Sequence, residues 1–295
     1  MKLYAPSYYK KFKCIADKCE HSCCIGWEID IDRDTLQKYN NLDCEYKSEI
    51  TDSISMDETP HFKLDASERC PHLNECGLCK IILNVGEDHL CDICREHPRF
   101  YNYTSVAELG IGASCPEAAR IILDSPNYNI LEYIGEVDAQ EDYVDFDARI
   151  LRDGIYKILK DETLGYSDRL KKIYDVYSIT ADNDSEWTEK LPGLEYLDPD
   201  HKNLFMNYSS ENRPNCVDEY LERFLAYSIY RHCTESLDKE EFRERLSFCL
   251  FCERLLSSLA FSEGAISLHE VARLASIISE EIEYSDDNTF ALTYL

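Results

Sequence analysis

The chain has 295 residues, of which 44% are hydrophobic, enough for a core in one large domain or two modest ones. Its 31 basic and 58 acidic side chains leave a formal net charge of -27, which repels phosphate backbones and anionic lipid, so we expect no nucleic-acid partner. The same negative charge would attract a lysine-rich partner protein, although many proteins are acidic only because charge keeps them soluble. No stretch approaches the roughly 20 apolar residues of a membrane helix, so we expect no membrane role.

The cysteines are numerous and unevenly spread. The first residues lack the apolar segment and small-residue cleavage site of an export signal, so we expect a cytoplasmic protein. Fifteen cysteines in that reducing compartment favour metal or redox chemistry over a disulfide framework. Eleven of them lie between Cys14 and Cys115.

The cysteine-rich part of the chain predicts short elements. We expect a strand over 27–31, a helix over 34–50 and an extended piece over 61–64, with turns around most cysteine groups. Such short elements are typical of a domain in which metal ligation replaces part of an apolar core.

From Cys115 onward the pattern becomes helical. Pro116 followed by Glu-Ala-Ala-Arg indicates a helix with proline at its first position. Apolar residues at helical spacing predict further helices over 150–159, 170–177, 217–229, 239–261 and 265–279, with a long connection over 183–203. The predicted fold class is therefore mainly α: a cysteine-rich metal-binding domain with short strands over 1–125, followed by a helical domain over 126–295.

The spacing of the cysteines predicts at least one metal centre. The groups are Cys14-x4-Cys19-x3-Cys23-Cys24, Cys70-x5-Cys76-x2-Cys79, Cys91-x2-Cys94 and Cys115-Pro116. Several cysteines on tight loops can bring their sulfurs to one centre, and thiolates suit zinc or iron–sulfur clusters better than hard cations. Structural zinc is an alternative because of the paired Cys-x2-Cys groups, although eleven cysteines exceed the four ligands of one closed zinc site.

Arginines and histidines among the cysteines are further candidates. Arg95 and Arg99 can pair with a cofactor carboxylate or offset the charge of a thiolate-bound cluster, and ion pairs with nearby acids are the equal alternative. His72, His89 and His97 can ligate metal or move protons. Hydrogen-bonded or solvent-facing roles are favoured for them, because thiolates are already plentiful.

Other patterns favour structural roles. The run Glu108 to Gly112 (ELGIG) imitates the loop that binds S-adenosylmethionine in Rossmann-like methyltransferases, but such a loop needs a repeated βαβ sheet, which is not predicted here. Cys249 and Cys252 share one face of an apolar helix, so we expect both to pack in a core. We expect the same of Cys44.

Four runs of residues carry a resemblance to a known family. They are FKCIADKCEHSCCIGWEIDID over 12–32, FKLDASERCPHLNECGLCKI over 62–81, LCDICREHPRF over 90–100 and SCPEAARIIL over 114–123. In these runs the chain resembles the flagellin lysine N-methyltransferase family, within a wider group of cysteine-rich zinc- or iron-chelating (CxxCxxCC) proteins. The remainder of the chain is similar to the family only in its general helical character.

The resemblance implies methylation of flagellin lysine side chains, with S-adenosylmethionine as methyl donor. It also implies a cysteine-bound metal centre, for which a 4Fe–4S cluster is expected and zinc is the alternative. The metal ligands that it implies are Cys14, Cys19, Cys23, Cys24, Cys70, Cys79, Cys94 and Cys115. The chain departs from the family pattern at His97, where a tyrosine is expected, and Cys76 and Cys91 look additional.

Lysine attacks a methyl group only as the neutral amine, so the site requires desolvation of the lysine or a neighbouring Asp, Glu or Tyr as base. The sequence singles out no one residue for that role. The alternative function is a non-catalytic iron- or zinc-binding module for electron transfer, redox sensing or metal handling.

Overall fold

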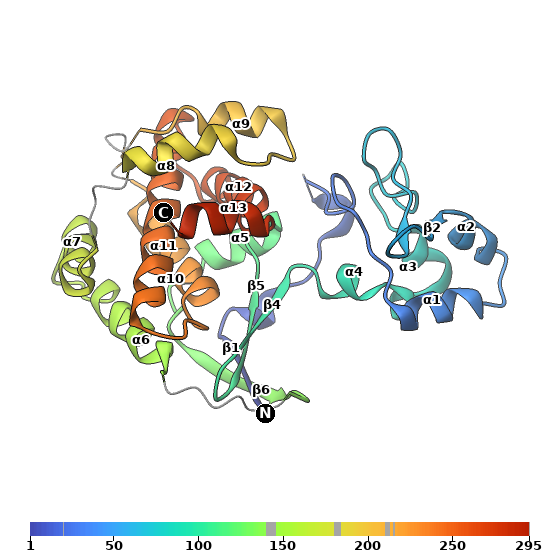
Figure 1. Cartoon of the computed structure of the whole chain (residues 1–295), viewed down its shortest axis with the longest axis horizontal. Coiled ribbons are helices and arrows are strands. Elements are labelled where there is room, and N and C mark those ends of the chain that lie inside the picture. Colours follow the sequence, from blue (N-terminus) through green and yellow to red (C-terminus); the bar gives the residue numbers. More distant parts are fainter. Residues whose placement is uncertain (20, 140–145, 180–183, 210–212, 215, 295) are drawn as a thin grey trace. The chain divides into compact units, whose positions relative to one another are not determined.

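The computed structural model describes residues 1–19, 21–139, 146–179, 184–209, 213–214 and 216–294. The chain forms two compact units, a larger one from Met1–Phe12 with Arg99–Leu295 and a smaller one from Lys13–Pro98 (Figure 1). The smaller unit is therefore an insertion into the larger one. These bounds differ from the expected domains over 1–125 and 126–295, because the first strand and residues 99–125 supply a sheet and a helix to the larger unit.

The larger unit contains a mixed sheet of four strands in the order β4-β5-β1-β6. The strands are β1 (Lys2–Pro6), β4 (Arg99–Tyr103), β5 (Ala107–Ile111) and β6 (Leu131–Glu136). Strand β1 runs parallel to β5 and antiparallel to β6, while β4 and β5 are antiparallel, with Phe100 opposite Gly110. Phe100 also contacts Tyr227 and Tyr230 edge-on, which joins the sheet to the helices.

Helices make up most of the larger unit and confirm the mainly α fold class. They are α5 (Pro116–Leu123), α6 (Ala148–Leu159), α7 (Tyr166–Tyr177), α8 (Asp184–Lys190), α9 (Pro199–Phe205), α10 (Asp218–His232), α11 (Lys239–Ser262), α12 (Leu268–Ile278) and α13 (Asp286–Thr293), with the π-helical turn η6 (Ser279–Glu283) and the 3-10 turns η1 (Tyr9–Lys11) and η5 (Leu191–Gly193). The five helices expected from apolar spacing after residue 126 are thus present, within a few residues of the predicted bounds. The described part of the chain contains no helix with the length and apolarity needed to cross a bilayer.

The long connection predicted over 183–203 is wrong over its described part, 184–203. That stretch forms α8, η5 and α9 in sequence. Trp187 on α8 is buried and stacks on Phe251 of α11 at a centroid distance of 4.9 Å. Burial of this aromatic side chain against α11 stabilises a short helix that local sequence alone does not predict.

The smaller unit consists of short elements around a core of its own. They are η2 (Ala16–Lys18), α1 (Arg33–Asn40), α2 (Lys47–Asp52), β2 (Ile54–Ser55), β3 (His61–Phe62), α3 (Lys80–Val85), η3 (Glu87–His89) and α4 (Asp92–Glu96). The single helix expected over 34–50 is therefore two helices, separated by a turn. The strand expected over 27–31 is also wrong, since Asp30 forms only an isolated bridge to His61.

Candidate metal centre

Five cysteine side chains line the core of the smaller unit. Cys70 and Cys91 are buried in it, and Cys24, Cys79 and Cys94 are half-buried against it. Most of the other side chains in this core are isoleucine, leucine, tyrosine and phenylalanine. Thiols are therefore concentrated in an otherwise apolar interior.

Short local elements position these five cysteines, which we call the core thiols. Cys79 is the residue that precedes α3, Cys91 is the residue that precedes α4, and Cys94 follows within the first turn of α4. Cys70 donates its backbone N–H to the carbonyl oxygen of Cys24 at 2.9 Å, which joins two segments that are distant in sequence.

Several polar contacts lie at the sulfur atoms themselves. The Sγ atoms of Cys91 and Cys94 are 3.4 Å apart. Backbone N–H groups act to lower the pKa of three thiols: that of His72 at Cys70, those of Ile81 and Ile82 at Cys79, and that of Cys94 at Cys91. Donors of this kind favour the thiolate form that binds metals.

Burial raises the thiol pKa values, whereas hydrogen bonds between neighbouring thiols lower some of them and raise one. Burial raises the pKa of Cys70 to about 12 and also raises the pKa of Cys79. The hydrogen bond between Cys91 and Cys94 raises the pKa of Cys94 and lowers that of Cys91. A hydrogen bond with the preceding cysteine lowers the pKa of Cys24 to about 7. Cys24 and Cys91 are therefore the core thiols that ionise most readily.

The donor set suits a soft metal. Thiolates bind zinc and iron–sulfur clusters in preference to hard cations. Within the described residues, no group of three or more Cys, His, Asp or Glu side chains is already arranged to hold a metal ion. Metal ligation by the core thiols therefore requires their sulfurs to move closer together.

The eight ligands implied by the resemblance fall into three places. Cys24, Cys70, Cys79 and Cys94 are core thiols. Cys14 and Cys23 are exposed, and the half-buried Cys19 thiol donates to the carbonyl oxygen of His21 at 2.8 Å. Cys115 lies in the larger unit, where it precedes α5. The fifth core thiol, Cys91, is one that the resemblance left aside.

The two candidate cofactor-binding arginines lie in different units. Arg95, on α4, forms an ion pair with Asp92 and a longer one of 3.6 Å with Glu96. Arg99, in the larger unit, donates from Nε to the Tyr9 hydroxyl at 2.9 Å, and its guanidinium lies 5.7 Å from the centre of the Phe12 ring. A role for either in cofactor binding stays a prediction.

His72 is buried and hydrogen-bonded through both ring nitrogens. Nδ1 lies 2.7 Å from the Tyr46 hydroxyl, and Nε2 lies 2.9 Å from the Ser53 hydroxyl. Burial lowers the pKa of His72 to about 4. With both nitrogens engaged, His72 holds the core together and has no free position for a metal.

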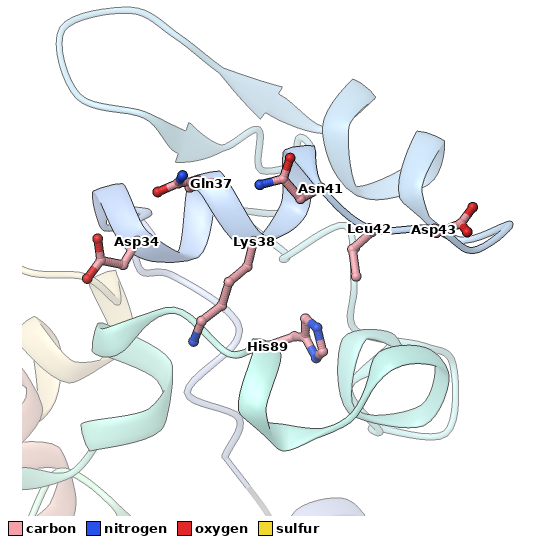
Figure 2. A pocket seen from close by; sticks show the side chains of 7 residues that line it. All are labelled: Asp34, Gln37, Lys38, Asn41, Leu42, Asp43 and His89. Carbon is pink, nitrogen blue, oxygen red and sulfur yellow. The ribbon is translucent and has the colours of Figure 1, made fainter.

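His89 borders an open, polar pocket of the smaller unit. Figure 2 shows that its ring and the Lys38 side chain reach into the same space from η3 and α1. The residues that line this pocket are Asp34, Gln37, Lys38, Asn41, Leu42, Asp43 and His89. None of these residues is a cysteine, so the core thiols do not line this pocket.

The first four residues of the ELGIG run, 108–111, belong to strand β5 and contribute to packing. The Glu108 carboxylate is buried and accepts from Nη2 of Arg152 at 3.0 Å. A side chain at Gly110 would collide with the ring of Phe100 on the neighbouring strand. The acid and the glycine are thus explained by an ion pair and a close strand contact.

The remaining cysteine predictions have mixed outcomes. Cys249 and Cys252 are buried in the core of the larger unit, as expected. The prediction that Cys44 is buried is wrong, because the residue is exposed in the turn between α1 and α2.

The sequence did not indicate a buried polar network in the larger unit. Its centre is Glu283 in η6, whose carboxylate accepts from the Tyr227 hydroxyl at 2.7 Å and lies 2.8 Å from Nε2 of His232. Tyr227 in turn accepts from the backbone N–H of Ala113 at 2.9 Å. In the sequence, this acid is one of three glutamates over 279–283 that directly follow an amphipathic helix, and composition alone would place them on the surface.

Comparison with known proteins points to one family. No family model and no solved structure matches the chain. Over 130 residues, 41% of this chain, it is 29% identical to the flagellar biosynthetic protein FliU of Salmonella muenchen, of which the match covers 77%. It is equally similar to the lysine-N-methylases of Salmonella typhimurium and Salmonella choleraesuis, but the match spans only 32% of their length. Over this part of the chain, the relatives confirm the resemblance to the lysine N-methylase family.

Proposed function

We propose that the chain is a protein-lysine N-methyltransferase that methylates flagellin, with S-adenosylmethionine as methyl donor and a cysteine-bound metal centre. The observation that carries the proposal is the similarity to two proteins named lysine-N-methylase, together with one named for flagellar biosynthesis. The net charge of -27 supports it, because a strongly acidic surface favours the approach of a lysine-bearing protein.

In this reaction the neutral lysine nitrogen forms a bond to the methyl carbon as the bond from that carbon to the sulfonium sulfur breaks. S-adenosylhomocysteine leaves with the electron pair of the broken bond, and the methylated nitrogen takes over the positive charge. The site must therefore remove a proton from the lysine ammonium before the transfer, by desolvation or through a neighbouring base.

The metal centre of this proposal is supported by the core thiols. Five thiols in one small core are a donor set for zinc or for an iron–sulfur cluster. When bound, such a centre would supply cross-links between the short elements that carry its ligands. An iron–sulfur cluster is proposed first, with zinc as the alternative.

The test is methyl transfer by protein purified without oxygen. The full chain is incubated with flagellin and S-adenosylmethionine carrying a labelled methyl group, and labelled lysines are located by peptide mass spectrometry. Flagellin with acetylated lysines is the matched control, since its lysine nitrogens are no longer nucleophilic. We expect label on the unmodified flagellin alone. Protein that contains metal but transfers no label would support the non-catalytic metal module instead.

A further inference from the structure

Two cysteines that look additional to the family pattern have opposite environments. Cys76 is exposed, in the turn before α3. Cys91 is only 1% exposed, in the core of the smaller unit. Their spacing in the sequence does not distinguish them, since each is the first cysteine of a Cys-x2-Cys group, Cys76 with Cys79 and Cys91 with Cys94.

The distance between Cys91 and Cys94 is close to that of two ligands on one metal ion. Four sulfurs at about 2.3 Å from a tetrahedral centre lie about 3.8 Å from one another. The observed separation of 3.4 Å between the two Sγ atoms is near this value, and far from the bonded distance of a disulfide. The pair thus needs little adjustment to share one zinc ion, whereas in a 4Fe–4S cluster each iron takes one cysteine and the two sulfurs would lie farther apart.

The other core thiols share the same core as Cys91. Cys70 is buried in this core, and Cys24, Cys79 and Cys94 are half-buried against it. Several thiolates in such an apolar core repel one another. A bound cation removes this repulsion, because it replaces the protons of the thiols that ligate it.

The backbone around Cys91 is fixed from several sides. Its carbonyl oxygen accepts the N–H of Arg95 at 2.9 Å, which begins α4. The N–H of the following residue, Asp92, donates to the Asp32 carboxylate at 2.9 Å, and that carboxylate also caps α1. The backbone of Cys91 is therefore held by the first turn of α4 and, through the next residue, by the cap of α1.

We propose that Cys91 is a metal ligand, together with Cys94 and two further core thiols from Cys24, Cys70 and Cys79, and that Cys76 is not a ligand. This assignment rests on the metal centre of the proposed function. It differs from the ligand set implied by the resemblance, because it includes a cysteine outside that set and excludes the exposed Cys14.

The matched comparison is Cys91→Ser against Cys76→Ser in the full chain, purified without oxygen. Iron and zinc per chain are measured by elemental analysis, and thiolate-to-iron charge transfer by visible absorption. Loss of a residue that only orients a ligand weakens metal affinity by about 10- to 100-fold, so loss of a ligand should weaken it at least as much. We expect Cys76→Ser to retain the metal content of the wild type and Cys91→Ser to lose most of it.

Folding is controlled with a second variant. Unlike Cys91→Ser, Cys91→Ala does not bury a hydroxyl group without a hydrogen-bond partner. We expect this variant to lose metal as well. Its circular dichroism spectrum should match that of metal-free wild-type protein, which would show that the variant is folded to the same extent. A folded Cys91 variant with full metal content would overturn the assignment, as would loss of metal from Cys76→Ser. Wild-type protein without metal would instead overturn the proposed metal centre itself. Metal-loaded protein without methyl transfer would overturn the proposed reaction and leave the assignment standing.

Discussion

The two units of this chain are stabilised by different means. In the larger unit α10 and α11 pack together along their length and bury large apolar side chains such as Phe224 and Leu255. In the smaller unit the helices have eight residues or fewer, and Cys70 and Cys91 occupy core positions beside Tyr39. Helices this short are marginal when isolated, so the smaller unit depends on its small core. With the proposed metal centre bound, we expect cross-linking through the thiols to stabilise the smaller unit and not the larger one.

Removal of metal should have the largest effect and should act on one unit alone. Structural zinc contributes roughly 10–16 kcal/mol of apparent binding free energy in small zinc-binding peptides, so the smaller unit should lose most of its stability with a chelator. Hydrogen exchange followed by mass spectrometry measures this separately for peptides of 13–98 and 99–295. We expect faster exchange in the smaller unit and little change in the larger one. Equal protection of both units after complete metal removal would contradict the comparison.

The opposite test removes apolar packing from the larger unit. Leu255→Ala on α11 deletes a fully buried side chain and should lower the free energy of unfolding by about 2–5 kcal/mol, while metal content stays unchanged. Leu237→Ala is the matched control, because the same substitution is made at a side chain that is 68% exposed. Denaturant unfolding measures both. If Leu255→Ala also released metal, the two units would not be independent in stability.

The sequence predicted the helices of the larger unit because their burial follows a local pattern. Helices α6, α10 and α11 repeat apolar residues every three or four positions, and this period is visible in a single segment. The sheet has no such signal. Strand β1 pairs with β6 from Lys2 opposite Glu136, so the pairing joins segments far apart in sequence.

The polar interior and the core thiols were harder to predict for a related reason. The run Ser279–Glu283 contains three glutamates and would be placed on the surface by composition, yet all three are buried. Two of the carboxylates are bound by distant side chains, Glu281 by His201 and Glu283 by His232. Cysteine spacing identified the region that contains the core thiols, but it did not identify which cysteines are buried there. Cys91 and Cys76 differ in burial, which depends on the packing of α3 and α4 and not on spacing.

Neutralising Glu283 should destabilise the larger unit by a smaller amount than the loss of Leu255. Glu283→Gln keeps the shape of the side chain but removes the charge that pairs with His232 and Arg231, at a cost of about 1–3 kcal/mol. Burial alone raises the pKa of Glu283, but Arg231 and the hydrogen bond from His232 lower it to about 2. Its stabilisation is therefore complete above the pKa of an unfolded glutamate, about 4.3, and is lost as pH falls toward 2.

The pH dependence of unfolding tests this network separately from packing. Between pH 5 and about 3, wild-type protein should lose stability relative to Glu283→Gln, because the unfolded wild-type chain gains a proton at this position and the folded protein does not. Glu189→Gln, at an exposed position of α8, should follow the wild-type profile. Parallel pH profiles for wild type and Glu283→Gln would show that folding does not shift the pKa of this carboxyl group.

The smallest expected effect concerns a helix end in the larger unit. The Ser267 hydroxyl accepts from the backbone N–H of Glu270 at 3.3 Å, and the Glu270 carboxylate accepts from the N–H of Ser267 at 2.9 Å, which forms a capping box at α12. Ser267→Ala removes one of these bonds and should cost about 1 kcal/mol of unfolding free energy, whereas Ser267→Thr should retain most of it. Because α12 packs on α5 and α11, this loss should appear in the unfolding of the larger unit and leave hydrogen exchange over 13–98 unchanged. Accelerated exchange in the smaller unit would mean that its stability depends on the helices as well as on its thiols.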